Sequence, residues 1–286
     1  MSSISVVIPA YDQAEFIDAC LDSVAAQTWD GELEVIVVDD ESPDDIGERA
    51  RAHSLAPTVI RQKNTGVAGA RNRGVAESSG EWIAFLDADD RWTPDKLERQ
   101  MGALQKTRRP ALSFCRYRRF TPDGQIVDVN PDHPEVDLDA TPQKLMTRNF
   151  IGTSTVVVHR DCIARCGGFP ESGMLKKCGQ DFALWLRIAA YFPLVYVPHI
   201  GMEYTVHKKN RVGVDPVRHH RGGLEALRDF RNWDPERFKA LAPASLSGMV
   251  ALRTGKFLVD SLTHRDSFPA GSVRRALRES AELLWP

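Results

Sequence analysis

Several features that would define a protein class directly are missing from this 286-residue sequence. Its five cysteines are scattered and form no CxxC pair, which argues against a disulfide framework and against a zinc site. The most apolar long stretch, residues 182–202, contains Arg187, two prolines and His199, so it does not predict a membrane-spanning helix. No basic region leads into an apolar one near Met1, and we therefore expect no signal peptide and a cytoplasmic protein.

The best-known catalytic motifs of α/β enzymes are also missing. The sequence contains no GxxxxGK[ST] loop, no GxGxxG, no GxSxG and no HExxH. P-loop kinases, Rossmann dehydrogenases, α/β-hydrolases and zinc proteases therefore have no motif support. The usual nucleic-acid-binding motifs are absent too, and we expect no nucleic-acid partner.

The charge that is present is distributed unevenly along the chain. The total is only −2, but residues 1–90 carry 6 Lys and Arg against 18 Asp and Glu, a net charge of −12. Residues 91–214 carry +7 and residues 215–286 carry +3. Because many of the acidic residues gather at a few loop positions, the pattern indicates a cation held there for an anionic small ligand, although solvation of the surface accounts for most of them.

Apolar segments typical of buried strands alternate with amphipathic segments typical of helices. Strands are predicted over residues 4–9, 33–38, 58–61 and 82–86, and helices over residues 12–24, from residue 42, and over residues 67–78. Asp12 with Glu15, and Ser42 with Pro43, predict the starts of the first two helices. This alternation predicts a mostly parallel sheet with helices on both faces and ligands at the carboxyl ends of its strands, where the acidic clusters fall.

The second half of the chain divides into a continuation of this unit and a helical extension. Further strands are predicted over residues 111–120, 153–158 and 194–198, a surface loop over 128–142 and a helical segment over 180–190. Beyond about residue 215 the pattern is helical and rich in arginine, with an apolar stripe at Leu224, Leu227 and Phe230. The last segment, with Arg274, Arg275, Arg278 and Trp285, fits either a helix on a membrane surface or a helix docked on the domain.

Five motifs in order resemble family 2 glycosyltransferases of the GT-A fold. They lie at residues 6–12 (VVIPAYD), 20–28 (CLDSVAAQT), 34–42 (EVIVVDDES), 64–74 (NTGVAGARNRG) and 85–90 (FLDADD). Residues 167–169 (GGF) and 180–187 (QDFALWLR) are similar to the acceptor-side part of the family. The sequence departs from the family at Glu41 and Pro43, which stand where Gly and Thr are usual, and at Gln180, where an acidic residue often precedes the base.

The resemblance implies an α/β GT-A fold, that of nucleotide-diphospho-sugar transferases, with a mostly parallel central sheet and a C-terminal helical extension. We expect a catalytic domain over residues 1–214, with a nucleotide-binding half (1–92) and an acceptor half (93–214), followed by the extension over 215–286. The implied activity is inverting transfer of a sugar from a nucleoside-diphosphate sugar to an acceptor hydroxyl. A nucleotidyltransferase and a non-catalytic nucleotide-sugar or glycan-binding module are the alternatives.

By position in the family motifs, Asp39 and Arg71 correspond to the pair that reads the base, with Pro9 and Tyr11 as the wall beside it. A pyrimidine presents an N–H donor beside a carbonyl acceptor, which a carboxylate and a guanidinium can bind together, so a UDP or dTDP sugar is favoured. Helix capping by Asp39 and a plain surface position for Arg71 are the structural alternatives.

The sequence Asp87-Ala88-Asp89 is a DxD motif at the end of a predicted buried strand. We assign Asp89 to a divalent cation, Mn²⁺ or Mg²⁺, and Asp87 to the ribose and the metal shell, since such a cation needs few carboxylates when a diphosphate supplies other oxygens. His207 is similar to a histidine that some family members place near the metal or diphosphate. Arg211 is expected to contact phosphate.

Inversion at an anomeric carbon needs a base on the face opposite the leaving group, and Asp181 is the candidate. Its alternative is an N-cap of the helix that it opens. Trp185, one turn later, is expected to form a platform for the acceptor or sugar, or else to fill the core. The acceptor itself stays open among a glycan, a lipid-linked intermediate, a peptide and a natural product, with peripheral membrane contact through the C-terminal helices as a further possibility.

Overall fold

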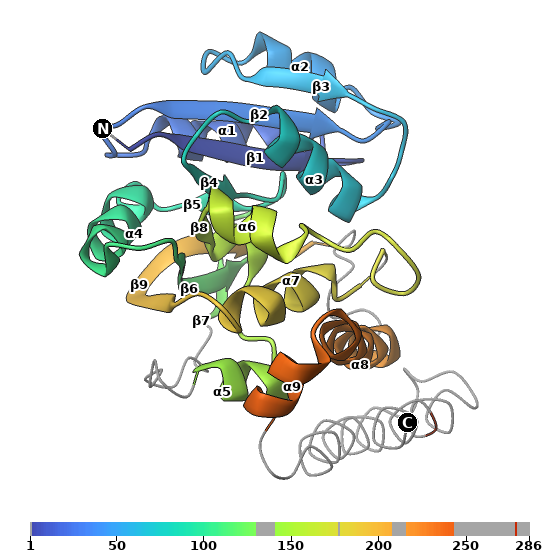
Figure 1. The fold of residues 1–286 in the computed structure, drawn as a ribbon. Coiled ribbons are helices and arrows are strands. Elements are labelled where there is room, and N and C mark those ends of the chain that lie inside the picture. Colours follow the sequence, from blue (N-terminus) through green and yellow to red (C-terminus); the bar gives the residue numbers. More distant parts are fainter. Residues whose placement is uncertain (1, 130–140, 177, 208–215, 243–277, 279–286) are drawn as a thin grey trace.

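The computed structural model describes residues 2–129, 141–176, 178–207, 216–242 and 278, and Figure 1 shows their arrangement around a nine-stranded sheet. Four parallel strands from the first part of the chain are neighbours in the order β3-β2-β1-β4. They are β1 (Ile4–Ala10), β2 (Leu33–Asp39), β3 (Thr58–Arg61) and β4 (Trp82–Phe85). The predicted parallel sheet is confirmed in this half of the molecule.

The other strands extend the sheet with mixed directions. They are β5 (Arg91–Trp92), β6 (Leu112–Phe120), β7 (Ile126–Val129), β8 (Val157–His159) and β9 (Leu194–Thr205). Strand β8 lies antiparallel between β4 and β6, while β9 is parallel to β6 and pairs with β5. The sequence predicted that the last strand stops near Pro198; β9 instead continues to Thr205, past register shifts in its pairing with β6. This continuation carries the chain back toward the loop after β4.

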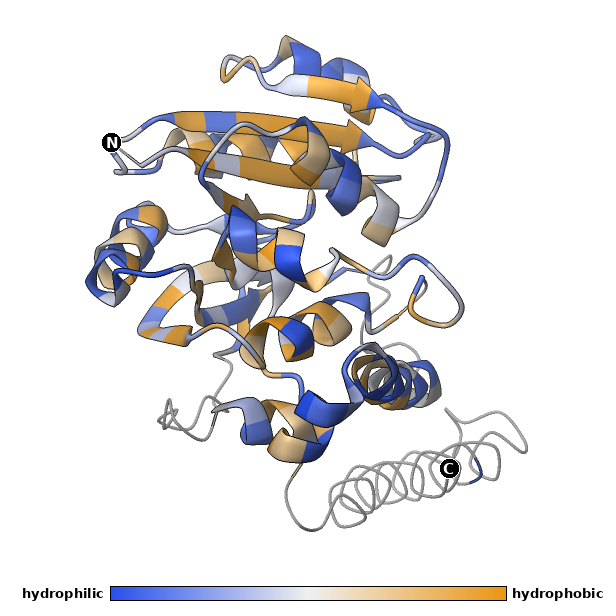
Figure 2. Ribbon diagram, in the orientation of Figure 1, coloured by the Kyte–Doolittle hydropathy of each residue, from blue (hydrophilic) through white to orange (hydrophobic). Residues whose placement is uncertain are grey.

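Helices cover both faces of the sheet because alternate strand residues point to opposite sides. Val6 and Ile8 pack in one hydrophobic cluster and Val7 in the other, and Figure 2 shows the apolar central strands between the helices. The first cluster takes side chains from α1 (Ile17–Ala25), α2 (Ile46–Ala52) and α4 (Lys96–Leu104). The second takes them from α3 (Val67–Glu77), α5 (Thr141–Thr147), α6 (Arg160–Cys166), α7 (Gln180–Ala189), α8 (Pro216–Trp233) and α9 (Pro235–Leu241).

The two predicted helix starts are wrong. Helix α1 begins at Ile17 and α2 at Ile46, and neither has a side-chain hydrogen bond at its N-cap. The Asp12 backbone N–H instead donates to the Ser42 hydroxyl at 2.8 Å, and that hydroxyl donates to Asp44 at 2.5 Å. These polar side chains join the loops after β1 and β2 to each other, a use that local sequence spacing does not reveal.

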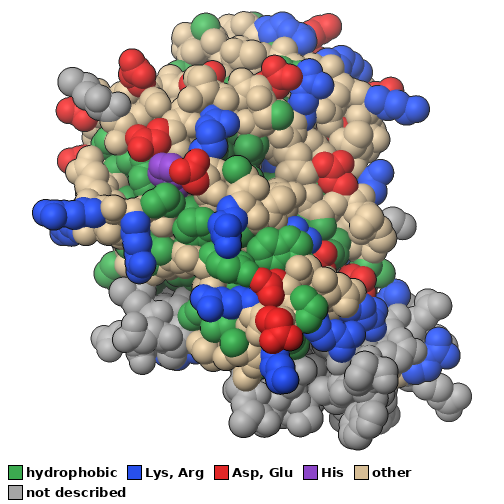
Figure 3. Space-filling model, in the orientation of Figure 1, with side chains coloured by type: hydrophobic (Ala, Val, Ile, Leu, Met, Phe, Trp, Pro, Cys, Tyr) green, Lys and Arg blue, Asp and Glu red, His purple; other side chains and the backbone are tan. Residues whose placement is uncertain are grey.

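The described C-terminal helices α8 and α9 pack against the cluster that contains α7. The predicted stripe Leu224, Leu227 and Phe230 is confirmed as buried, in the same cluster as α7. Basic side chains lie over α8 on the face seen in Figure 3. Within the described residues no helix combines the length and apolarity needed to cross a membrane. The membrane-surface segment predicted around Arg274 and Trp285 lies outside the described residues, apart from Arg278, which is exposed.

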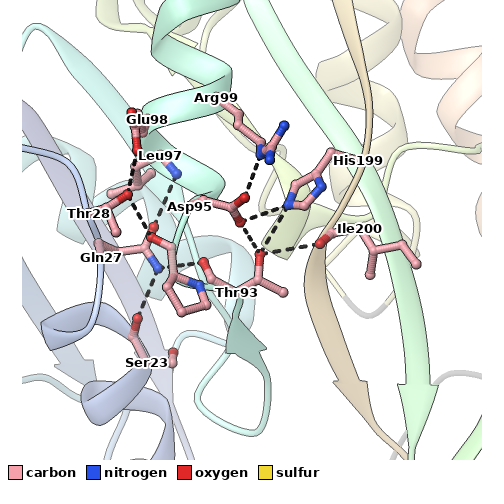
Figure 4. Close-up of polar contacts among 11 residues, drawn as sticks. Ser23, Gln27, Thr28, Thr93, Asp95, Leu97, Glu98, Arg99, His199 and Ile200 are labelled. Atoms are coloured by element: carbon pink, nitrogen blue, oxygen red, sulfur yellow. Dashed lines mark hydrogen bonds and ion pairs between the residues drawn. The ribbon is translucent and has the colours of Figure 1, made fainter.

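A polar cluster joins the start of α4 to β9 (Figure 4). The Asp95 carboxylate lies 2.9 Å from Nε2 of His199 and 2.5 Å from Nε of Arg99. Partial burial acts to raise the pKa of Asp95, but hydrogen bonds from Arg99 and His199 outweigh it and lower the pKa to about 2. The Thr93 hydroxyl donates to Ile200 O at 3.2 Å. These contacts fix the middle of β9, from which its last residues reach the site described below.

Candidate active site

The acidic loop after β4 lies at the carboxyl edge of the parallel strands. Strands β1 and β2 run in register to Ala10 and Asp39, and β4 lies on the other side of β1. Ligands of open α/β sheets bind at this edge. Residues 87–90 begin there, after the buried Phe85 and Leu86.

Asp89 and His207 contact each other at this loop. Asp89 Oδ2 lies 2.9 Å from His207 Nε2, and the two side chains are 11% and 7% exposed. The His207 ring also lies against the Phe16 ring, with centroids 4.5 Å apart, and Thr205 donates its hydroxyl proton to Asp89 O. The end of β9 thus brings together two residues that the sequence assigned to a metal, although 117 residues separate them along the chain.

Arg71 of α3 pairs with Asp87. Its Nη2 lies 2.6 Å from Asp87 Oδ1, with the arginine side chain 4% exposed and the aspartate 32% exposed. The guanidinium carbon lies 5.4 Å from the centroid of the Phe169 ring. The neighbouring Asn72 holds Phe169 by accepting from its N–H at 2.9 Å and donating to its carbonyl at 2.8 Å. Phe169, from the second half of the chain, therefore packs against Arg71 of the first half.

Asp90 is buried behind these residues. Ser154 donates its hydroxyl proton to Asp90 at 2.6 Å and accepts the Asp87 backbone N–H at 3.1 Å. Burial, with the charges of Asp89 and Asp87, raises the pKa of Asp90 well above its ordinary value. Burial and the same acidic loop also raise the pKa of the Cys20 thiol. The loop concentrates negative charge, which a bound cation would stabilise.

The donor atoms fit a hard divalent cation that also binds a ligand. Within the described residues, no group of three or more His, Cys, Asp or Glu side chains would hold a metal ion by itself. The Asp89 carboxylate and His207 imidazole, with Asp87 two residues away, leave several coordination positions for other oxygens. Mn²⁺ or Mg²⁺ needs such open positions when it is bound through one or two carboxylates together with a phosphate.

Asp39 does not contact Arg71 in the structure. Its side chain is completely buried; Oδ1 accepts the Ser42 N–H at 2.8 Å and Oδ2 lies 2.6 Å from Arg61 Nη1. Pro9 is buried at the end of β1 and Tyr11 is 37% exposed. The sequence analysis missed Arg61, whose position at the carboxyl end of a predicted parallel strand was the available signal.

Asp40 is a second residue that the sequence analysis missed. Its carboxylate accepts the backbone N–H groups of Thr65 at 2.9 Å and Gly66 at 2.8 Å, just before α3 begins. The Gln62 amide donates to it as well, at 2.9 Å. Asp40 therefore anchors the start of the helix that carries Arg71, and its signal in the sequence was the acidic pair at the end of β2.

Asp181 is the second residue of α7, not its N-cap. The cap is Gly179, with φ of +87° in the left-handed region, so the N-cap alternative for Asp181 is wrong. Asn149 donates from Nδ2 to Asp181 Oδ2 at 3.2 Å. Arg211, the expected phosphate contact, lies outside the described residues.

The expected platform at Trp185 is wrong, and its core alternative is correct. The side chain has no exposed surface. Its ring centroid lies 5.8 Å from that of Phe169 and 6.3 Å from that of Phe85. An acceptor sugar has no exposed ring face to stack on, because α7 turns this position toward the sheet.

The mostly parallel sheet with helices on both faces and an acidic loop at its carboxyl edge defines a protein of the GT-A fold, which the solved structures named below share. The chain belongs to the family described as "Glycosyl transferase family 2", whose model matches residues 5–165, more than half of its length. It is accordingly a glycosyltransferase, which decides against a nucleotidyltransferase and against a non-catalytic module.

Relatives and solved structures agree with this assignment. The "UDP-Glc:alpha-D-GlcNAc-diphosphoundecaprenol beta-1,3-glucosyltransferase WfaP" of Escherichia coli is 30% identical over 190 residues, covering 66% of this chain and 70% of the relative. The fold is similar to S. aureus TarS in complex with UDP-GlcNAc, with a TM-score of 0.68 at 15% identity over 98% of this chain and 81% of the other. It is also similar to the mannosyltransferase PcManGT of Pyrobaculum calidifontis in complex with GDP-Man and Mn²⁺, with a TM-score of 0.66 at 20% identity over 99% and 81%.

Proposed function

We propose that the chain is a metal-dependent inverting glycosyltransferase that moves a sugar from a UDP or dTDP sugar to an acceptor hydroxyl. The observation that carries the proposal is the contact between Asp89 and His207 beside the pair of Asp87 and Arg71. Asp89 and His207 provide a carboxylate and an imidazole that can bind a cation. Arg71, paired with Asp87, adds a positive charge at the edge of the sheet where ligands bind.

The donor base is assigned to Asp39 and Arg71, beside Pro9 and Tyr11. In the structure the Asp39 carboxylate is completely buried and accepts hydrogen bonds from Ser42 N–H and Arg61, so its contact with a pyrimidine N–H requires the half-exposed Arg61 side chain to move away from it. The UDP-glucose in the name of WfaP and the UDP-GlcNAc bound to TarS support a uracil donor. The GDP-mannose bound to PcManGT makes the choice of base an experimental question.

Asp89 and His207, with Asp87, are the residues that would hold Mn²⁺ or Mg²⁺. When bound, the cation supplies positive charge that stabilises the leaving diphosphate. Arg71 fixes Asp87 on one side of the loop, and the backbone N–H of Asp87 is fixed by Ser154. The Mn²⁺ in the PcManGT complex supports the use of a divalent cation on this fold.

Asp181 is proposed as the base that accepts the proton of the attacking acceptor hydroxyl. It lies in the first turn of α7, and its Oδ2 accepts a hydrogen bond from Asn149. Attack on the face opposite the diphosphate inverts the anomeric carbon. Among the open acceptor classes, the lipid diphosphate in the name of WfaP supports a lipid-linked intermediate. Peripheral membrane contact through residues 215–286 and a cytoplasmic location stay predictions.

The proposal is tested with a panel of UDP, dTDP and GDP sugars, by measuring release of the nucleoside diphosphate with Mn²⁺ and with EDTA. We expect slow release from a UDP or dTDP sugar that EDTA abolishes. Asp181→Asn should lower turnover by roughly 10²–10⁴-fold with little change in donor affinity. Asp161→Asn is the matched control, because Asp161 is also the second residue of a helix but is exposed on α6.

Two results would refute parts of this proposal. Turnover that EDTA leaves unchanged would exclude the metal requirement. An Asp181→Asn variant as active as Asp161→Asn would exclude Asp181 as the base. The anomeric configuration of the product, determined by NMR, decides between inversion and retention.

A further inference from the structure

Residues 149–154 contact both parts of the proposed active site. At one end, Asn149 donates to Asp181. At the other end, Ser154, within the 3₁₀ turn Thr153–Thr155, bonds the Asp87 backbone N–H and the Asp90 carboxylate. Within the part of the chain that the structure describes, no side-chain contact joins Asp181 directly to Asp87 or Asp90. This short segment is therefore a physical connection between the proposed base and the acidic loop.

The orientation of the Asn149 amide is determined by a second hydrogen bond. Its Oδ1 accepts the backbone N–H of Ile151 at 3.2 Å, which leaves the NH₂ group as the part of the amide that meets Asp181. Ile151 is only 1% exposed and packs in the cluster that also contains α7. A buried anchor two residues away thus holds the donor in place.

We propose that Asn149 is a positioning residue for Asp181, an inference that rests on the proposed role of Asp181 as the base. The Asn149 N–H occupies a lone pair on Oδ2 and restricts rotation of the carboxylate, leaving Oδ1 for the acceptor hydroxyl. Because the donor is neutral, it holds the carboxylate without forming an ion pair that would compete for the acceptor proton.

Two arginines, one on α7 and one on the neighbouring α6, have partners other than Asp181. Arg187 of α7 forms a bidentate pair with Asp229 of α8 and donates to Cys166 O. Arg165 of α6 lies over the Tyr191 ring, 4.6 Å from its centroid. The other charged residues on these elements and on α5 are Lys144, Arg160, Asp161, Arg218, Arg221, Glu225, Arg228 and Arg231. Among the described contacts, Asn149 is the side chain that donates to Asp181.

Asn149→Asp tests the proposal with little change of shape. The new carboxylate still accepts the Ile151 N–H but offers Asp181 a like charge in place of a donor. We expect kcat to fall by about 10-fold or more and the acid limb of the kcat profile to move to higher pH by about one unit. The dissociation constant of the donor, measured by calorimetry, should stay within about twofold. Thr147→Val is the control, because it removes a hydrogen bond to Lys144 O in the adjoining turn without touching Asp181.

Asn149→Leu provides a second variant, which removes the donor without adding charge. We expect a similar loss of kcat with an unchanged dissociation constant of the donor. If either folded variant keeps the wild-type kcat, or if Asn149→Asp lowers kcat without moving the acid limb, the positioning role is refuted. Asp181→Asn separates the two hypotheses. Wild-type turnover in Asp181→Asn refutes Asp181 as the base. Loss of turnover in Asp181→Asn, with Asn149 variants that behave like wild type, refutes only the positioning role of Asn149.

Discussion

Lys96, the first residue of α4, is completely buried. We expect its buried charge to lower the free energy of unfolding by a measurable amount. Its ammonium lies 4.1 Å from the centre of the Trp92 ring, and Nζ has no hydrogen-bond partner among the described residues. Burial lowers its pKa from 10.5 to about 8, a change that the nearby Cys115 thiol partly opposes. At about 1.4 kcal/mol per pH unit, this difference corresponds to about 3 kcal/mol of destabilisation at neutral pH.

The sign of the pH dependence follows from the lowered pKa. Between pH 8 and 10.5 the unfolded chain binds more protons at this lysine than the folded chain, so the free energy of unfolding rises with pH across this window. Lys96→Met removes the charge and keeps an unbranched chain against Trp92. After about 1 kcal/mol for the lost cation–π contact, the variant should be about 2 kcal/mol more stable than wild type at pH 7.

Urea unfolding at pH 7 and pH 10 measures this difference. We expect the advantage of Lys96→Met to fall by about 2 kcal/mol between the two pH values, because the wild-type lysine becomes neutral in the folded state. Cys115 stays mostly protonated at pH 10 in both proteins, because burial raises its pKa to about 11 and loss of the Lys96 charge raises it further. Lys63→Met, at an exposed position, should match wild type at both pH values. An advantage that is equal at pH 7 and pH 10, or a less stable variant at pH 7, would refute the reasoning.

Three further predictions concern the active site and the helix packing. Asp89→Asn should weaken Mn²⁺-dependent binding of a UDP sugar by at least about 10-fold in calorimetry; equal affinities for variant and wild type would count against Asp89 as a ligand. A pocket that reads a pyrimidine should favour UDP or dTDP over GDP by about 1–3 kcal/mol in competition binding, and equal affinities would contradict that assignment. Gly222→Ala would place a Cβ atom 2.9 Å from Cys178 Sγ and 3.0 Å from Cys178 O, and should cost about 1–3 kcal/mol; an unchanged Tm would show that α8 shifts freely.

Local patterns in the sequence were sufficient for the parallel half of the sheet. The strands predicted over residues 4–9, 33–38 and 82–86 are β1, β2 and β4 with ends that differ by one residue. Buried parallel strands appear as continuous apolar runs, and the acidic residues that end them mark the edge where ligands bind. The helix predicted over residues 67–78 is α3, which ends one residue earlier, at Glu77.

Long-range pairing decided the features that the sequence analysis missed. The continuation of β9 to Thr205 depends on its register with β6 and on the contacts of His199 with α4. The predicted cap at Ser42 was wrong because its hydroxyl accepts the backbone N–H of Asp12, thirty residues away in the other loop, and donates to Asp44. A search for periodicity within a window does not detect such partners.

The sequence by itself determined the fold family and the types of side chain at the site, because these depend on short motifs with fixed spacing. Only the tertiary structure decided which of these side chains meet. Asp39 pairs with Arg61 while Arg71 turns to Asp87, and Asp181 receives a hydrogen bond from Asn149. Trp185 could be assigned to the core only once the orientation of α7 was known. A tryptophan at this helix position could face either the sheet or a ligand, and the sequence does not show which.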